Sequence, residues 1–285
     1  MKRLLIIILC LGLLVSCTRS EKEDKDISED VDIRIGCTTY PSSYAQALLL
    51  SEIVNRKGYT SKIIMNDTDK MWDNLGKGKT DVLLSGWVPT IDTERKAELE
   101  SVINDLGTNC RNLSNGIYVP NYTLTGFLCE LEDYKEEFSN TIYVCKESNI
   151  IIEETKNMLQ NYGMEYNIKE VGYKELDALI KKSIDNKEWI AIALWTPNGT
   201  INKFGLRHLR DTKSIFTNNI DTHTIVRSEY THPELLNILD NYYLRIGELN
   251  ELINVLIKNN QEKKIVNTWL DNNLHILNRV TYKPN

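Results

Sequence analysis

Apolar residues recur along this chain in two different patterns. Short apolar runs, typical of buried strands, alternate with longer segments whose apolar positions return every three or four residues, as on one face of a helix. The first half predicts strands at 31–36, 61–65, 82–86 and 116–120 and helices at 42–57 and 69–75. The second half predicts strands at 140–145, 166–171, 190–194 and 224–227 and helices at 150–162, 174–184, 233–243, 246–258 and 263–273.

The order of these elements predicts an α/β fold with parallel strands and right-handed crossovers. Because the strand–helix alternation occurs twice, we expect two lobes around a ligand cleft. The strand at 224–227 would return the chain to the first lobe, with hinge crossings near Tyr122 and at Asp221–Thr224. The expected division is a first lobe at 32–122, a second lobe at 123–222, and a return strand with C-terminal helices at 223–285.

Two of the predicted strands end in the motif Trp-x-Pro, at Trp87 and at Trp195. Proline cannot donate to a strand ladder, so each strand stops there. Each tryptophan therefore lies at the carboxyl end of a strand, where open α/β sheets place their ligand crevice. Two indole rings facing each other could enclose a cation without hydrogen-bond donors, such as a quaternary ammonium group. The alternative is that both are core or hinge tryptophans.

The N-terminus reads as an export signal. Lys2 and Arg3 precede an apolar stretch at 4–15, which is the length of a signal-peptide core and too short to span a membrane comfortably. The sequence Leu14-Val15-Ser16-Cys17 resembles a bacterial lipobox, whereas the alternative is an ordinary signal peptide. We therefore expect a signal peptide at 1–16, a lipidated Cys17 and a charged tether at 17–31. The mature protein would be a lipoprotein of the cell envelope, anchored to the membrane and facing its extracytoplasmic side.

Composition excludes several function classes. The chain has 34 basic and 40 acidic residues, and without Lys2 and Arg3 the balance is 32 against 40, a net charge of −8. Since no basic stripe is present, we expect no nucleic-acid partner. The mature chain keeps four cysteines besides Cys17, without the CxxC spacing of zinc or thioredoxin-like sites, so no metal or cofactor is expected. Disulfides and buried thiols both remain open for Cys37, Cys110, Cys129 and Cys145.

No catalytic motif stands out. Gly78-Lys79-Thr80 looks like the end of a phosphate loop, but Asp73 replaces the glycine that the loop requires. The sequence has no nucleophile elbow and no zinc-protease helix motif. None of the four histidines lies beside an obvious nucleophile in the sequence; they are His208, His223, His232 and His275.

Several short segments fall in the order and spacing of one known family. They are Ile35-Gly36, Tyr40, Ala45, Gly58-Tyr59, Asp67, Met71-Trp72, Gly78, Asp81, Trp87-Val88-Pro89-Thr90, Asp105-Leu106-Gly107, the segment 116–122 and Leu194-Trp195-Thr196-Pro197. On these residues, the chain from about Val31 to Asn273 resembles the extracytoplasmic substrate-binding proteins of glycine betaine, choline and carnitine ABC transporters. The resemblance implies the type II periplasmic-binding fold, a small quaternary-amine ligand and a transporter permease as partner.

The resemblance also implies an aromatic cage around a trimethylammonium group. By position, Trp87 and Trp195 are its main walls, and Tyr40 stands where the family usually has a third tryptophan. Tyr118 and Tyr122 near the hinge are further candidates. The other three tryptophans are expected to be structural; they are Trp72, Trp189 and Trp269.

The chain departs from the family where a ligand carboxylate would be bound. The family often has His-Trp after the second motif, where this chain has Asn198 and Gly199. It also has a histidine near the end of the first motif, where this chain has Asp92. Asn198 can still donate through its amide, whereas an ionised Asp92 cannot.

The sequence therefore predicts a lipid-anchored solute receptor rather than an enzyme. It does not distinguish betaine from choline or carnitine. Three alternatives remain: a receptor of the same fold for another small ligand, an envelope-anchored hydrolase or transferase, and a signalling or scaffold lipoprotein that has lost its ligand. The hydrolase alternative requires a nucleophile–base pair in the cleft.

Overall fold

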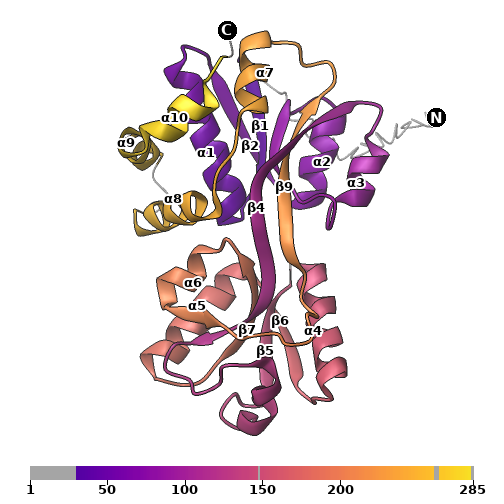
Figure 1. Cartoon of the computed structure of the whole chain (residues 1–285), viewed down its shortest axis with the longest axis vertical. Helices are drawn as coiled ribbons and strands as arrows, with labels where there is room; N and C mark the ends of the chain where they lie inside the picture. The colour runs from indigo at the N-terminus through magenta and orange to yellow at the C-terminus, as the bar shows by residue number, and fades with distance from the viewer. Residues whose placement is uncertain (1–29, 147, 260–262, 284–285) are drawn as a thin grey trace, which may run out of the picture. The chain divides into compact units, whose positions relative to one another are not determined.

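A single mixed sheet runs through the computed structural model, which describes residues 30–146, 148–259 and 263–283 (Figure 1). The predicted signal peptide and Cys17 lie outside the described residues, as does all of the tether except Asp30 and Val31. Within the described part of the chain, no helix has the length and apolar character needed to cross a membrane.

The elements up to the middle of the chain alternate between strands and helices, as predicted. They are β1 (Ile33–Thr38), α1 (Pro41–Arg56), β2 (Ser61–Asn66), α2 (Thr68–Gly76), β3 (Val82–Gly86), α3 (Thr93–Glu98), β4 (Ile103–Pro120) and the 3-10 helix η1 (Leu128–Tyr134). The remaining elements are β5 (Thr141–Cys145), α4 (Asn149–Tyr162), β6 (Asn167–Val171), α5 (Tyr173–Asp185), β7 (Ala191–Thr196), α6 (Gly199–Phe204), β8 (Leu206–His208), β9 (Asn218–Arg227), α7 (Pro233–Asp240), α8 (Ile246–Lys258), α9 (Lys264–Asn272) and α10 (Leu274–Val280).

The strand order is β2-β1-β3-β9-β4-β7-β5-β6, with β8 paired to β4. β1 runs parallel to β2 and β3, and β5 runs parallel to β6 and β7. Between these two parallel groups, β9 and β4 pair antiparallel with each other and with their outer neighbours β3 and β7. The predicted α/β class with two parallel units is therefore confirmed.

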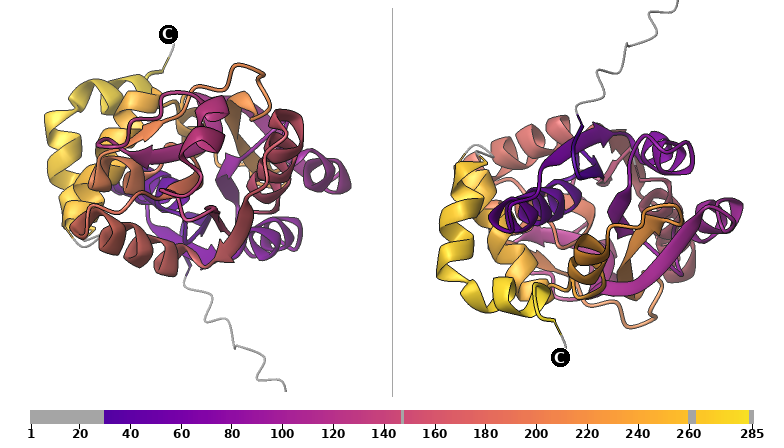
Figure 2. Two further views of the ribbon diagram at one scale, coloured as in Figure 1. Left: turned by 90° about the horizontal axis from the view of Figure 1, so that it is seen from below. Right: turned by 90° about the horizontal axis from the view of Figure 1, so that it is seen from above.

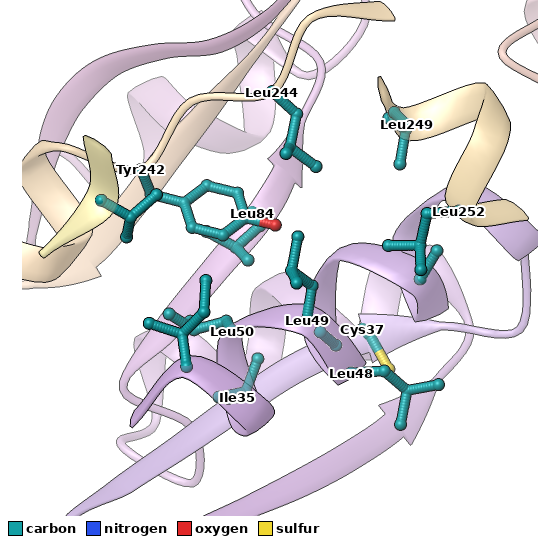
Figure 3. Packing of buried hydrophobic residues seen from close by; sticks show 14 of the residues in the cluster. Ile35, Cys37, Leu48, Leu49, Leu50, Leu84, Tyr242, Leu244, Leu249 and Leu252 are labelled. Carbon is teal, nitrogen blue, oxygen red and sulfur yellow. The ribbon is translucent and has the colours of Figure 1, made fainter. Parts of the chain in front are cut away.

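The first core lies between the β1–β3 group and the helices that cover it. Leu48, Leu49 and Leu50 of α1 pack near Ile35 of β1, and Tyr242 closes the same cluster (Figure 3). α1 is apolar along most of its length because the C-terminal helices also cover it; α8 and α9 both contact it (Figure 2). Proline at its first position starts the helix, since its missing N–H would be unpaired there anyway.

The second core is formed by the β5–β7 group with α4, α5 and η1. It contains Ile142, Ile192, Leu131 and Phe138, all nearly inaccessible to solvent. Trp189 packs at its edge, 5.2 Å from Phe138 between ring centroids. As expected, the other two structural tryptophans, Trp72 and Trp269, are buried.

The long strands β4 and β9 pass between the two cores (Figure 1). On β4 the core changes between Leu113 and Ile117, and at the second crossing it changes between Phe216, just before β9, and Ile220 of β9. Residues 117–119, at the end of β4, pack in the second core. The expected crossings near Tyr122 and at 221–224 stay predictions. The sequence predicts only the strand at 116–120, because the polar residues 104–112 show no strand pattern, whereas β4 begins at Ile103.

The cysteines in the first core are thiols. Cys37 and Cys110 are buried and not joined in disulfides, while Cys129 is an exposed thiol. Burial raises the pKa of Cys37 and of Cys110 to about 12, which keeps both neutral.

A buried carboxyl group ties the two crossing strands together. Glu154 of α4 accepts hydrogen bonds from the Asn115 amide at 2.8 Å and from the Thr217 backbone N–H at 2.9 Å, and it also binds the Thr217 hydroxyl. The Asn115 backbone N–H donates to the Thr217 carbonyl at 2.9 Å. Glu154 therefore attaches β4 and the start of β9 to the second lobe at the point where the chain crosses.

Replacing Glu154 by alanine leaves these buried donors without an acceptor. We expect Glu154→Ala to lower the free energy of unfolding by about 3 kcal/mol, measured by urea denaturation. The matched control is Glu153→Ala on the same helix, whose exposed carboxylate pairs only with Lys156 at 2.7 Å. That variant should stay within about 0.5 kcal/mol of the parent protein. Equal losses in the two variants would contradict the role assigned to Glu154.

Candidate ligand-binding site

The two Trp-x-Pro motifs lie at the carboxyl ends of parallel strands, as predicted. Trp87 directly follows β3, and Trp195 is near the end of β7. In both motifs the peptide bond before proline is cis. Trp195 is buried in the second core, whereas Trp87 is half-buried and packs against both cores.

Tyr40 links the first lobe to Trp195. It lies between β1 and α1, yet its ring packs on the second core. Its ring centroid is 5.1 Å from that of Trp195, and the two planes are inclined by 72°, an edge-to-face contact. The structure thus brings together Tyr40 and Trp195, two of the predicted aromatic residues, from opposite lobes.

Tyr173 is a third aromatic residue at this place, and sequence reasoning missed it. It is the first residue of α5 and follows Gly172 at the end of β6. Its ring centroid lies 6.1 Å from Trp195 and 6.4 Å from Tyr40. Its position just after a parallel strand, like that of Trp87, is the signal that could have identified it. We call Tyr40, Tyr173 and Trp195 the aromatic group.

Asn198 supplies a polar atom next to the aromatic group. It is buried at the start of α6, where its Oδ1 accepts from the Thr200 backbone N–H at 3.0 Å and from the Tyr173 hydroxyl at 3.1 Å. Burial raises the pKa of Tyr173 to about 12, so the phenol stays protonated and can donate. The Asn198 amide nitrogen is buried and has no hydrogen-bond partner among the described residues. Its N–H groups are therefore free to donate to a molecule bound at this place.

Gly199 brings the second lobe directly against the first. A side chain at this position would overlap Ile257 of α8, and its Cβ would lie 2.7 Å from Ile253. The absence of a side chain therefore lets the start of α6 touch α8. Where the family often has a large aromatic residue, this chain has a close backbone contact between the lobes.

The structure places the other two predicted aromatic residues away from this group. Tyr118 pairs with Ile192 in the ladder in which Trp195 pairs with Asn115, and this register directs Tyr118 to the opposite face of the sheet. Its ring packs on His208, 5.0 Å away. Tyr122 is 41% exposed and donates its hydroxyl to the Glu188 carbonyl at 2.6 Å.

Asp92 is buried beneath the turn that carries Trp87. Its carboxylate accepts from the Trp87 backbone N–H at 2.7 Å. Burial raises the pKa of Asp92 to about 6, although the Trp87 N–H opposes the shift. The carboxylate thus binds the protein's own backbone.

One histidine lies beside a hydroxyl and a carboxylate. His223 is 2.9 Å from Asp105 through Nδ1 and 3.2 Å from the Thr108 hydroxyl through Nε2. Lys96 and the Gly107 N–H also bind the Asp105 carboxylate. These residues lie on the paired β4 and β9 strands, roughly 20 Å along β4 from the level of Trp195. They form an interstrand network of the first lobe, away from the aromatic group.

The chain was compared with known families and relatives. The model of the substrate-binding domain of ABC-type glycine betaine transport systems matches residues 31–272. The glycine betaine/carnitine transport binding protein of Listeria monocytogenes is 23% identical over 147 residues, which are 50% of this chain and 49% of that protein. The chain thus aligns with about half the length of this curated relative.

Solved structures share the fold over most of the described chain. The glycine betaine/L-proline-binding protein of Borrelia burgdorferi superposes with a TM-score of 0.75 at 24% identity, covering 88% of this chain and 97% of its own. The lactococcal protein OpuAC, closed on glycine betaine, gives a TM-score of 0.76 at 19% identity, covering 88% and 99%. The present chain thus has the two-lobed type II periplasmic-binding fold. It belongs to the family of substrate-binding domains of ABC-type glycine betaine transport systems.

Proposed function

We propose that the protein captures a quaternary ammonium compound of the glycine betaine class between its lobes and presents it to an ABC transporter permease. The observation that carries this proposal is the aromatic group, in which Tyr40 of one lobe meets Trp195 and Tyr173 of the other. Trp87 lies at the end of a neighbouring strand and packs against both cores, so it is the fourth wall of the proposed cage.

Aromatic faces suit this ligand because a trimethylammonium group has no hydrogen-bond donor. Its charge is spread over methyl groups, which can contact the negative faces of several rings at once. A desolvated cation–π contact contributes about 2 kcal/mol, and micromolar binding requires about 8 kcal/mol. Several rings must therefore act together, which is consistent with walls contributed by both lobes.

Asn198 supports a ligand that also carries a carboxylate. Among the described residues its amide nitrogen is a buried donor without a partner, and its oxygen accepts from Tyr173 and Thr200. Leaving such a donor unpaired costs free energy, which a carboxylate oxygen would recover. The chemistry favours a betaine, whose charged carboxylate is a stronger acceptor than the neutral hydroxyl of choline.

The proposal includes a lipid anchor at Cys17. Its support is the sequence Leu14-Val15-Ser16-Cys17 after an apolar stretch, followed by a charged segment before Val31. An anchored receptor would remain near its permease while the charged segment allows it to reach the transporter.

The aromatic cage predicts a specific loss of affinity. Trp87→Ala and Tyr173→Ala should each weaken glycine betaine binding by at least about tenfold, or about 1.4 kcal/mol, measured by calorimetry. Trp269→Ala is the control, because Trp269 is buried in the first core. It should lower the melting temperature without a specific change in affinity.

A neutral analogue separates a cation cage from an apolar pocket. Replacing the trimethylammonium group by a tert-butyl group keeps the shape and removes the charge. We expect this analogue to bind at least about tenfold more weakly than glycine betaine. Equal affinity for the two compounds would contradict the proposed function.

The Asn198 amide predicts ligand preference. Asn198→Asp keeps the shape but replaces the donor by a negative charge, so it should weaken glycine betaine by more than about tenfold while choline loses less. Competition binding of the two ligands measures this ratio. Asn186→Asp adds the same charge at an exposed site of the same lobe and should leave the ratio unchanged. A parallel loss of both ligands in Asn198→Asp would argue against a role in carboxylate binding.

The anchor has its own test. Cys17→Ser should abolish acylation and leave the precursor unprocessed or the protein released, as seen by mass spectrometry of the membrane fraction. Cys129→Ser is the matched control, because Cys129 is an exposed thiol in the second lobe. A mature N-terminus at any residue other than Cys17 would refute the lipid anchor.

A further inference from the structure

The turn that follows β3 is closed by one side chain. Asp92 accepts from the Trp87 backbone N–H at 2.7 Å, and its own N–H donates to the Trp87 carbonyl at 2.8 Å. The Ile91 N–H donates to the same carbonyl at 2.8 Å. Both backbone polar groups of Trp87 are thus bound by Asp92, which limits the directions in which the indole can point.

The Asp92 carboxylate has an unusual environment for a charge. Asp92 is only 5% exposed, and no cation in the described ranges forms an ion pair with its carboxylate. Arg95 of α3 and Asp69 of α2 are the charged groups that act on it, with opposite signs. Arg95 itself is paired with Asp73 and Glu98. The carboxylate is therefore held mainly by the neutral backbone amide of Trp87, and the buried Trp72 indole N–H also lowers the pKa of Asp92.

We propose that Asp92 is a positioning residue of the ligand site: its carboxylate holds the Trp87 wall in place, and protonation of the carboxylate loosens that wall. A hydrogen bond to an ionised acceptor is about twice as strong as one between neutral groups. Protonation therefore weakens the hold on the Trp87 amide without removing it. The role of Trp87 as a wall rests on the proposed function, whereas its attachment to Asp92 does not.

The same protonation acts on stability in the opposite direction. Burial raises the pKa of Asp92 above its ordinary value to about 6, so the folded protein favours the neutral acid. Asp92 then contributes stability as the pH falls through about 6, while the Trp87 turn becomes less firmly held.

The indole can be observed without ligand. Protein labelled with 5-fluorotryptophan gives a fluorine NMR signal for Trp87, which is assigned by its loss in Trp87→Phe. We expect this signal to shift between about pH 5 and pH 8, with a midpoint near 6. In Asp92→Asn the amide oxygen can still accept from Trp87 but does not titrate, so the shift with pH should vanish. Asp69→Asn, which removes a nearby exposed carboxylate, should keep the titration.

Affinity gives the second measurement, with tetramethylammonium as a probe that has no titrating group. We expect Asp92→Ala to weaken its binding by about tenfold and Asp92→Asn by roughly threefold. A Trp87 signal that still titrates in Asp92→Asn, or that does not titrate in the parent protein, would overturn the proposal. If the signal titrates as expected but tetramethylammonium and glycine betaine do not bind the parent protein, the proposed function fails while the positioning role stands.

Discussion

The pairing of β4 with β9 is the constraint on which the rest of the molecule depends. β4 contributes apolar residues to both cores, Leu113 to the first and Ile117 to the second, while Ile220 and Val226 of β9 pack in the first core. Their ladder is continuous but irregular, with register shifts between Asp105 and Ser114. Such bulges let paired strands bend while their remaining hydrogen bonds are kept. Glu154 fixes the far side of this region to the second lobe.

The geometry of the candidate site follows from how β4 and β9 join the two groups of parallel strands. Its aromatic residues stand at the ends of parallel strands or in the turns that follow them, which are rigid points of each lobe. Tyr40 and Trp195 meet only because the two lobes are close, so affinity and closure become coupled quantities in the proposed function. The polar atoms are equally constrained, since the Tyr173 hydroxyl holds the Asn198 amide in one orientation. In the proposed function, binding and lobe closure thus depend on the same few contacts.

The buried strands and the two Trp-x-Pro motifs could be predicted from the sequence, because short apolar runs are typical of buried strands. β3 has the predicted bounds, and Trp87 and Trp195 were expected at the strand ends where they lie. The first half of β4 was missed, since residues 104–112 are polar and carry no clear alternation.

The missed parts of the site depend on strand pairing and burial, which no local pattern encodes. Tyr173 is one of 14 tyrosines, and only the place of β6 in the sheet brings it to Trp195. The face on which Tyr118 lies follows from the register of β4 with β7, which the sequence alone does not specify. Asp92 stands among charged residues and would be expected in solvent, but the turn after β3 folds over it.

The contact of Gly199 with α8 has a consequence for the size of the space between the lobes. At this point the backbone of Gly199 approaches Ile253 and Ile257 of α8 with no side chain between them, which is the closest approach that a protein chain allows. Any side chain at this position would act as a wedge between α6 and α8 and hold the lobes apart. In the proposed function, a residue outside the aromatic group would then set the volume available to a ligand, by changing how far the lobes close.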